Sequence, residues 1–206
     1  AVQAVGKIPF NVNELKVDMA AISAHKMYGP KSVGALYVRR RNPRVLLAPL
    51  IDGGGHERGM RSGTLNVPGI VGFAEAARLA AELMPEEMSR IRALRDRLHS
   101  GIAERLSHVT LNGHPEHRLP NTASCAFPGV DANALLALLA EEVAASAGAA
   151  CHTDAVHPSH VLTAMGVDAA TAMSTVRFSV GRFTTSRDVE EGVRRVLAAA
   201  RSLASP

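Results

Sequence analysis

Apolar residues follow two patterns along the chain, one typical of strands and one typical of helices. Residues 15–22 and 32–38 form short apolar runs, and the first has the composition of a strand buried on both faces. Gly29 and Pro30 mark a turn between the two runs. Lys26 follows the first run, so it lies where a strand of an α/β sheet ends, and such sheets bind ligands beyond those ends.

A long helical pattern occupies the middle of the chain. Residues 70–84 are rich in Ala, and Pro85 predicts the start of a new helix, because the first helical position needs no N–H. Beyond it, apolar residues recur every three or four positions and form one stripe. The stripe consists of Met88, Ile91, Leu94, Leu98, Ile102 and Leu106. We interpret this region as a bridge between a larger and a smaller domain.

Three strands are predicted in the C-terminal part of the chain, at residues 109–111, 120–127 and 174–183. The last of them alternates, with apolar residues on one face. Those apolar residues are Val176, Phe178 and Val180. Arg177 leaves the strand on the opposite face.

Two helices of this region carry capping signals. Asp131 is placed to cap the first, and Thr184, Thr185 and Ser186 with Asp188 are placed to cap the last. The last helix is amphipathic, and its apolar face should close the smaller domain. That face consists of Val189, Val193, Val196, Leu197 and Ala200.

Composition indicates a globular chain with an ordinary charge balance. The 206 residues are 47% hydrophobic and only 3% aromatic, so the cores are filled by Ala, Val, Leu and Met. The net charge is +4, and its densest cluster, residues 39–44, is either a nucleic-acid contact or a solvated turn. Without interleaved aromatic residues the solvated turn is favoured, and we expect no nucleic-acid partner.

No apolar run reaches the roughly 20 residues of a membrane span, so we expect no membrane contact. Two cysteines are too few for a disulfide framework and suit a reducing compartment. We therefore expect a cytoplasmic protein.

Besides the cysteines, three stretches carry candidate chemistry. Lys26, if shielded from water, becomes a usable amine nucleophile or base; the alternative is a solvated surface lysine. The glycines, basic groups and hydroxyls of residues 52–64 suit an anion such as phosphate, or else a flexible loop. The planar fork of Arg177 would clamp a carboxylate through two hydrogen bonds, although a surface arginine fits the pattern equally.

The two cysteines differ in their surroundings. Cys125 lies within an apolar run and is predicted to be buried and inert. Cys151 lies in a stretch of small residues, where a thiol is accessible and free to attack a bound substrate. The alternatives are an ordinary loop cysteine or a metal site with His152, His157 and His160, whose spacing fits no structural zinc pattern.

Residues 17–26, with Gly29 and Gly34, resemble the pyridoxal-phosphate lysine segment of the class V aminotransferases, and the cysteine desulfurase and selenocysteine lyase branch is the most similar. The resemblance implies that Lys26 binds the cofactor covalently, while Ser23 and His25 bind its phosphate. It also implies the C-terminal part of a fold type I, three-layer α/β/α large domain, followed by a smaller α+β domain.

Residues 1–7 resemble the family's Asp-Ala-x-Gln-x-x-Gly-Lys segment, in which the glutamine, here Gln3, bonds the cofactor's ring hydroxyl. The family's aspartate would fall just before Ala1, and its stacking histidine and phosphate loop further upstream. We therefore expect the C-terminal half of a longer enzyme. Residues 1–84 would be the remnant of the large domain, with unpaired strand edges, and residues 85–206 the small domain, with 85–106 as the bridging helix.

Three further segments extend the resemblance to the rest of the chain. The glycine loop matches a family loop whose threonine, here Thr64, binds the cofactor phosphate of the partner subunit, which implies a homodimer. Arg177 matches the arginine that binds the substrate carboxylate. Cys151 matches the catalytic cysteine, although residues 148–154 look more like animal selenocysteine lyases, which leaves the preferred chalcogen open.

The resemblance implies a pyridoxal-phosphate enzyme that removes sulfur from L-cysteine, or selenium from L-selenocysteine. The products would be L-alanine and a persulfide on Cys151, which serves a sulfur-acceptor or scaffold protein in iron–sulfur cluster or thio-cofactor assembly. The alternatives are a selenocysteine lyase and an inactive fragment that acts as a dimerisation or interaction module. An aminotransferase of the same fold is disfavoured, because transamination has no use for a mobile thiol.

Overall fold

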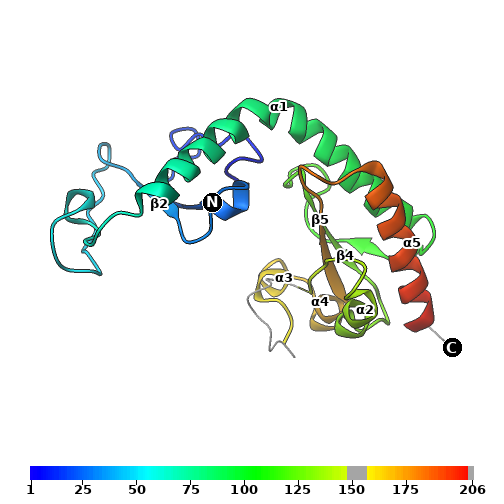
Figure 1. Cartoon of the computed structure of the whole chain (residues 1–206). Coiled ribbons are helices and arrows are strands. Elements are labelled where there is room, and N and C mark those ends of the chain that lie inside the picture. Colours follow the sequence, from blue (N-terminus) through cyan, green and yellow to red (C-terminus); the bar gives the residue numbers. More distant parts are fainter. Residues whose placement is uncertain (148–156, 204–206) are drawn as a thin grey trace. The chain divides into compact units, whose positions relative to one another are not determined.

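The computed structural model describes residues 1–147 and 157–203 and divides the chain into two compact units. The first unit comprises Ala1–Glu86 and the second Glu87–Pro206. Figure 1 shows the helices and strands of the two units.

Helix α1 (Val67–Ala103) contributes residues to both units and runs through Pro85 without a break. The prediction that Pro85 begins a new helix is therefore wrong. A proline inside a helix frees the carbonyl four residues earlier, here that of Ala81. Both residues are exposed, so water can satisfy this carbonyl and the helical pattern continues on either side.

The first unit contains a two-stranded antiparallel sheet. β1 (Met19–Ser23) pairs with β2 (Gly34–Val38), and the 3-10 helix η1 (Ala24–Met27) follows β1 directly. The prediction that residues 15–22 form a strand buried on both faces is wrong, because the strand starts later and Met19 is 49% exposed. The buried cluster of this unit is too small to cover both faces. Its members are Met27, Ala76 and Ala80.

Two glycines allow close backbone approaches around η1. A Cβ at Gly34 would lie 2.4 Å from the carbonyl oxygen of Ile22, which no side chain can avoid because the contact is with backbone. A Cβ at Gly29 would lie 3.0 Å from the Cβ of Ala76 in α1. The glycines therefore let the turn that carries Lys26 pack closely against β1 and α1.

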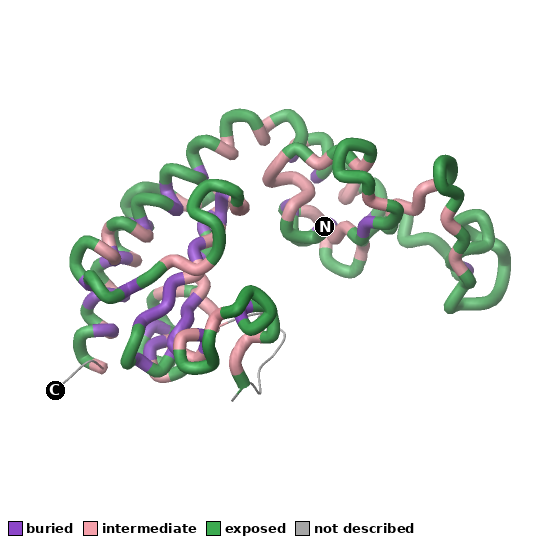
Figure 2. The backbone as a smooth tube through the Cα atoms, turned by 180° about the vertical axis from the view of Figure 1, so that it is seen from behind, coloured by how far each residue is buried: buried purple, intermediate pink, exposed green. Residues whose placement is uncertain are grey.

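The second unit is built on a three-stranded antiparallel sheet in the order β3-β4-β5. These strands are Thr110–Leu111, Thr122–Ala126 and Thr175–Ser179. Apart from Met88, the predicted apolar stripe is buried in a core that includes one face of the sheet. Figure 2 shows buried residues concentrated in this sheet. Central members of the core are Ile91, Leu98, Ile102, Phe127, Leu135, Val176 and Leu197.

Four more helices complete the described part of this unit. They are α2 (Ala132–Leu139), α3 (His160–Ala164), α4 (Ala169–Met173) and α5 (Ser186–Leu203). The predicted caps are confirmed at two of them. Asp131 accepts a hydrogen bond from the Ala134 amide at 2.8 Å, and Asp188 accepts one from the Thr185 amide at 2.8 Å. All the predicted apolar positions of α5 are buried.

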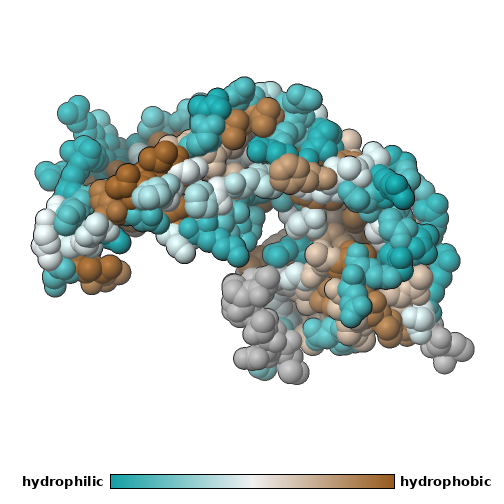
Figure 3. Space-filling view, viewed as in Figure 1, coloured by the Kyte–Doolittle hydropathy of each residue, from teal (hydrophilic) through white to brown (hydrophobic). Residues whose placement is uncertain are grey.

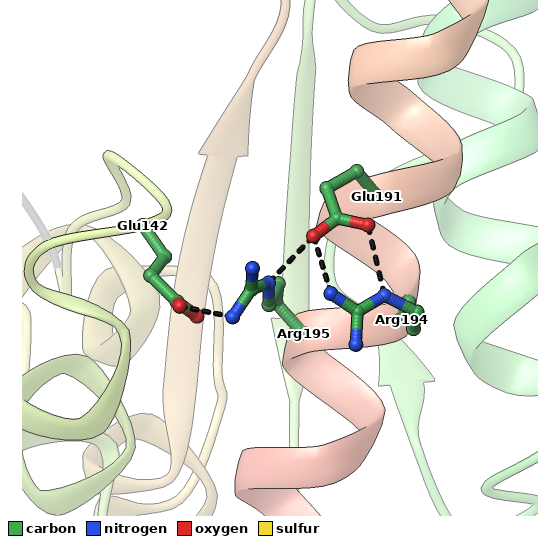
Figure 4. Close-up of polar contacts among 4 residues, drawn as sticks. All are labelled: Glu142, Glu191, Arg194 and Arg195. Atoms are coloured by element: carbon green, nitrogen blue, oxygen red, sulfur yellow. Dashed lines mark hydrogen bonds and ion pairs between the residues drawn. The ribbon is translucent and has the colours of Figure 1, made fainter.

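A network of ion pairs joins the segment that follows α2 to helix α5 (Figure 4). Arg195 contacts both Glu142 and Glu191, and Arg194 donates to Glu191 at 2.5 Å. These hydrogen bonds lower the pKa of Glu191 to about 2. Exposed pairs stabilise a fold only slightly. Their effect here is to fix where the chain leaves α2, four residues before Ser146.

The first unit carries many exposed apolar side chains. Figure 3 shows apolar residues gathered at the surface over the first turns of α1, where Val67 and Val71 are 58% and 63% exposed. Leu46 and Leu50 are exposed still further. In the described ranges, none of the helices has both the length and the apolar content that crossing a bilayer requires.

Candidate active site

Lys26 lies in η1, at the end of β1, as the sequence predicted. Its side chain is exposed, and its ammonium group has no hydrogen-bond or ion-pair partner within residues 1–147 and 157–203. The helix ends at Tyr28, which adopts left-handed φ and ψ angles of 66° and 17°. The Gly29 amide then donates to the Ala24 carbonyl at 2.9 Å and closes the turn. The fold thus presents a free amine on a tightly fixed turn.

Lys7, the last residue of the segment that resembles the family's Gly-Lys motif, is a neighbour of Lys26 to which the sequence assigned no role. Its ammonium group donates to the carbonyl oxygen of Lys26 at 2.9 Å. Burial lowers the pKa of Lys7, and the positive charge of Lys26 lowers it further. Two amines therefore share one end of β1. The sequence placed Lys7 in a family motif, but it gave no sign that this lysine contacts Lys26, which lies 19 residues further along the chain.

Ser23 and His25 are brought together on the same turn. The Ser23 hydroxyl and Nδ1 of His25 are 2.8 Å apart. A hydroxyl, an imidazole and the Lys26 ammonium group on one turn form a set of donors suited to an anion such as a phosphate, and the Lys7 ammonium is bonded to the backbone of that turn. Gln3 is exposed in the turn segment that also contains Lys7.

The glycine-rich loop has the unusual backbone that its composition predicted. Gly53, Gly55, Gly59 and Gly63 all have positive φ angles, between 68° and 141°. The loop contains the short helix η2 (Glu57–Gly59). Thr64 is exposed after the loop.

Arg177 lies at the centre of β5 in the second unit, on the face opposite Val176 and Phe178, as the alternation predicted. Its backbone forms a two-way bridge with Ser146: the Arg177 amide donates to the Ser146 carbonyl at 2.6 Å, and the Ser146 amide donates back at 3.2 Å. Its half-buried guanidinium has no partner among the residues that the structure describes.

Cys151 and His152 lie outside the described residues, so the predicted nucleophile and the alternative metal site are not placed. The last described residue before Cys151 is Ala147, directly after the Ser146 bridge. Over the described ranges, no three His, Cys, Asp or Glu side chains form a group able to hold a metal ion.

Cys125 is fully buried, as predicted, and burial raises the pKa of its thiol to about 12, although the charge of Arg118 acts in the opposite direction. The thiol is therefore protonated at neutral pH and unsuited to nucleophilic attack.

Comparison with known proteins places the chain in a family. Residues 1–191 match the description "Aminotransferase class-V". The chain belongs to the class V aminotransferase family. The predicted resemblance is thereby confirmed, and it extends over most of the chain.

The chain is similar to proteins named as cysteine desulfurases. The chain is 53% identical to "Cysteine desulfurase IscS" of Anaeromyxobacter dehalogenans over 194 residues, which cover 94% of this chain and 48% of the relative. It is 47% identical to "Cysteine desulfurase, mitochondrial" of Saccharomyces cerevisiae over 196 residues, which cover 95% of this chain and 39% of that relative. The chain therefore spans about half the length of the bacterial relative, and less of the yeast one.

Solved structures give the same picture. A "NIFS-LIKE PROTEIN" matches with a TM-score of 0.81 at 39% identity, covering 96% of this chain and 50% of that chain. The NifS-like protein from Rickettsia africae ESF-5 matches with a TM-score of 0.84 at 33% identity, covering 96% of this chain and 51% of that chain. These similarities confirm the predicted α/β fold class.

Proposed function

We propose that this chain supplies the cofactor lysine and the carboxylate-binding arginine of a pyridoxal-phosphate-dependent cysteine desulfurase. The observation that carries the proposal is the unpartnered amine of Lys26 on the same turn as the Ser23–His25 pair, in a chain 53% identical to a cysteine desulfurase. The chain covers half of that relative, so the activity proposed is that of the complete protein.

The residues present fit pyridoxal phosphate. An aldehyde needs a free amine, which Lys26 provides, and a phosphate needs donors, which Ser23 and His25 provide. Gln3 would bond the ring hydroxyl, and Thr64 would reach the phosphate bound by the other subunit of a homodimer. When bound, the cofactor withdraws electrons from the substrate Cα, a chemistry that protein side chains cannot supply.

The remaining steps belong to side chains of this chain. Arg177 holds the substrate carboxylate through its two parallel N–H groups. Lys26 Nζ would move the proton at the substrate Cα. The Cys151 thiolate attacks the substrate sulfur as the sulfur–carbon bond breaks. Overall, L-cysteine and the Cys151 thiol give L-alanine and a Cys151 persulfide, which balances all atoms.

The persulfide sulfur would pass to an acceptor or scaffold protein for iron–sulfur cluster or thio-cofactor assembly. L-selenocysteine is an alternative substrate, because the residues around Cys151 depart from the common bacterial pattern. We propose that the protein is cytoplasmic. The similar yeast protein is named as mitochondrial, so the compartment varies among similar proteins.

A second candidate function is favoured by the half-length match. The chain by itself would be a catalytically inactive module for dimerisation or interaction. Cofactor binding distinguishes this module hypothesis from the proposal that the chain carries the cofactor lysine. If this chain alone, mixed with pyridoxal phosphate and reduced with borohydride, retains the cofactor covalently at Lys26, the module hypothesis loses its basis.

The test of activity uses a chimera that joins this chain to the part of the A. dehalogenans desulfurase that it does not match. With pyridoxal phosphate, L-cysteine and a reductant, the chimera should form equal amounts of L-alanine and sulfide. Lys26→Ala should abolish both products, and Cys151→Ala should lower the rate at least about a hundredfold, since the nucleophile is lost. Cys125→Ala is the matched cysteine control and should leave the rate unchanged. A Cys151→Ala chimera with full activity would refute the role of that thiol.

A further inference from the structure

A row of polar residues crosses the sheet of the second unit at the level of Arg177. The strand registers place Ser124 of β4 directly opposite Arg177 of β5. The same registers place Asn112, just beyond β3, opposite Ser124, and its amide donates to the Ser124 carbonyl at 2.8 Å. Side chains of directly opposed residues share one face, so Asn112, Ser124 and Arg177 lie on the face away from Val176 and Phe178.

Backbone hydrogen bonds bring Ser124 and Arg177 especially close. Both backbone groups of Arg177 are used by Ser146, on the far side of β5 from β4. Arg177 and Ser124 are therefore a non-hydrogen-bonded pair of the antiparallel ladder. In such pairs the side chains lie closer than in hydrogen-bonded pairs, with Cα atoms about 4.5 Å apart.

The Ser124 hydroxyl oxygen accepts a hydrogen bond from Asn112, while its O–H group remains available to another acceptor. Nδ2 of Asn112 lies 3.4 Å from the Ser124 hydroxyl and 3.1 Å from the Thr175 hydroxyl. Thr175 is 2% exposed and donates onward to the Thr171 carbonyl at 2.8 Å, which fixes the Asn112 amide. Ser124 thus accepts from Asn112, and its own O–H has no acceptor within the described ranges.

We propose that Ser124 is a second substrate-binding residue, which donates its O–H to the carboxylate that Arg177 holds, with Asn112 as its positioning residue. The inference rests on the proposed role of Arg177. A carboxylate offers about four lone-pair positions, and a bidentate guanidinium takes two of them. An adjacent hydroxyl reaches a third, and a donor to an ionised oxygen forms one of the stronger hydrogen bonds in proteins.

The first test measures carboxylate binding to the 206-residue chain without cofactor. L-Alanine is titrated while the Arg177 Nε–H signal is followed by NMR, with Arg177→Lys used to assign the signal. Ser124→Ala should weaken binding about tenfold, as expected for loss of one hydrogen bond to a charged group. Ser124→Thr retains the donor and should restore binding. Ser179→Ala, on the same face but opposite Thr122, is the matched control and should bind as the parent chain does.

The outcomes separate the inference from the function on which it rests. Unchanged L-alanine binding by Ser124→Ala, or no shift of the Arg177 signal in the parent chain, overturns the inference. If Ser124→Ala does not fold, Ser124→Cys, with a weak donor of similar size, should show the same loss. Normal carboxylate binding with no alanine formed by the cofactor-loaded chimera would refute the desulfurase function and leave the carboxylate site standing.

A kinetic readout distinguishes binding from mere support of the sheet. In the chimera, Ser124→Ala should raise KM for L-cysteine about tenfold and leave kcat nearly unchanged, because the bond to the carboxylate is equally strong before and during the reaction. Inhibition by cysteamine, which lacks the carboxylate, should be the same in both proteins. An equal loss toward both compounds would mean that Ser124 only supports the fold, and would overturn the proposal.

Discussion

Cys125 has no exposed surface, and its elevated pKa, about 12, follows from that burial. Lys26 is the contrary case, an exposed amine without a partner on a turn fixed by Gly29. Residue type alone does not separate the two, since cysteine and lysine are both potential nucleophiles. Burial and partners make the difference, and they also govern His99 of the second unit.

The first prediction concerns the two cysteines. In the native chain, iodoacetamide at about pH 8 should label Cys151 and leave Cys125 unmodified, because a buried thiol with a raised pKa has almost no thiolate. Peptide mass spectrometry after labelling measures both sites, and labelling in about 6 M guanidinium, where both should react, is the control. Native labelling of Cys125 at the rate of Cys151 would contradict the burial argument.

The second prediction concerns the pH dependence of stability. Nε2 of His99 is buried without a hydrogen-bond partner among the described residues. Burial lowers the pKa of His99, the charges of Arg118 and Arg95 add to the effect, and Asp96 opposes it. His99 therefore takes up a proton more readily in the unfolded chain than in the folded chain. As a result, the free energy of unfolding falls as the pH drops through about 6.5.

Urea denaturation should show this loss between about pH 7.5 and pH 5.5. His99→Gln should reduce the pH dependence, whereas His108→Gln, at an exposed position, should not. Equal slopes for the parent chain and His99→Gln would remove His99 as the cause.

Among the elements, the short helices depend on their caps, and the longest helix tolerates a proline. α2 has eight residues, fewer than an isolated helix needs for stability, so its capping bond and the buried Leu135 and Leu139 hold it. α1 has enough turns and packed side chains on both sides of Pro85 to continue through it. Sequence signals for starting a helix were therefore reliable where a side chain satisfies the backbone, and misleading where the only signal was a proline.

The third prediction tests the cap of α2. Asp131→Ala should lower the free energy of unfolding by about 1 kcal/mol, because the Ala134 amide loses its acceptor. Urea denaturation measures the change. Asp131→Asn keeps an acceptor oxygen and should cost only a few tenths of that amount. A loss of the same size with asparagine would show that charge, not capping, is responsible.

On the scale of the whole molecule, the two units differ in how much apolar surface they bury. The core of the second unit joins three strands and two long helical segments, whereas the described cluster of the first unit has only Met27, Ala76 and Ala80. The first unit also leaves large apolar side chains exposed, among them Leu46 and Leu50. Since apolar burial is the main stabilising contribution, the first unit should open far more readily.

The fourth prediction follows from this difference. In native-state hydrogen exchange, the amides of β1 and β2 should exchange at least about a hundredfold faster than those of β4 and β5, because local opening exposes less buried surface. Adding pyridoxal phosphate should slow exchange around Lys26 if the cofactor binds this chain alone. Uniform protection across both sheets would mean that the first unit has stabilising contacts beyond its small cluster.

By itself the sequence determined the local features: the stripe of α1, the alternation of β5, the caps of α2 and α5, and the positions of Lys26 and Arg177. These depend on neighbours within a few residues, whose spacing is written in the chain. Only the tertiary structure decided that Met19 is exposed, that Lys7 bonds the carbonyl of Lys26, and that Ser124 lies beside Arg177. Such contacts join residues far apart in sequence, and strand register and the amount of core available to each unit create them.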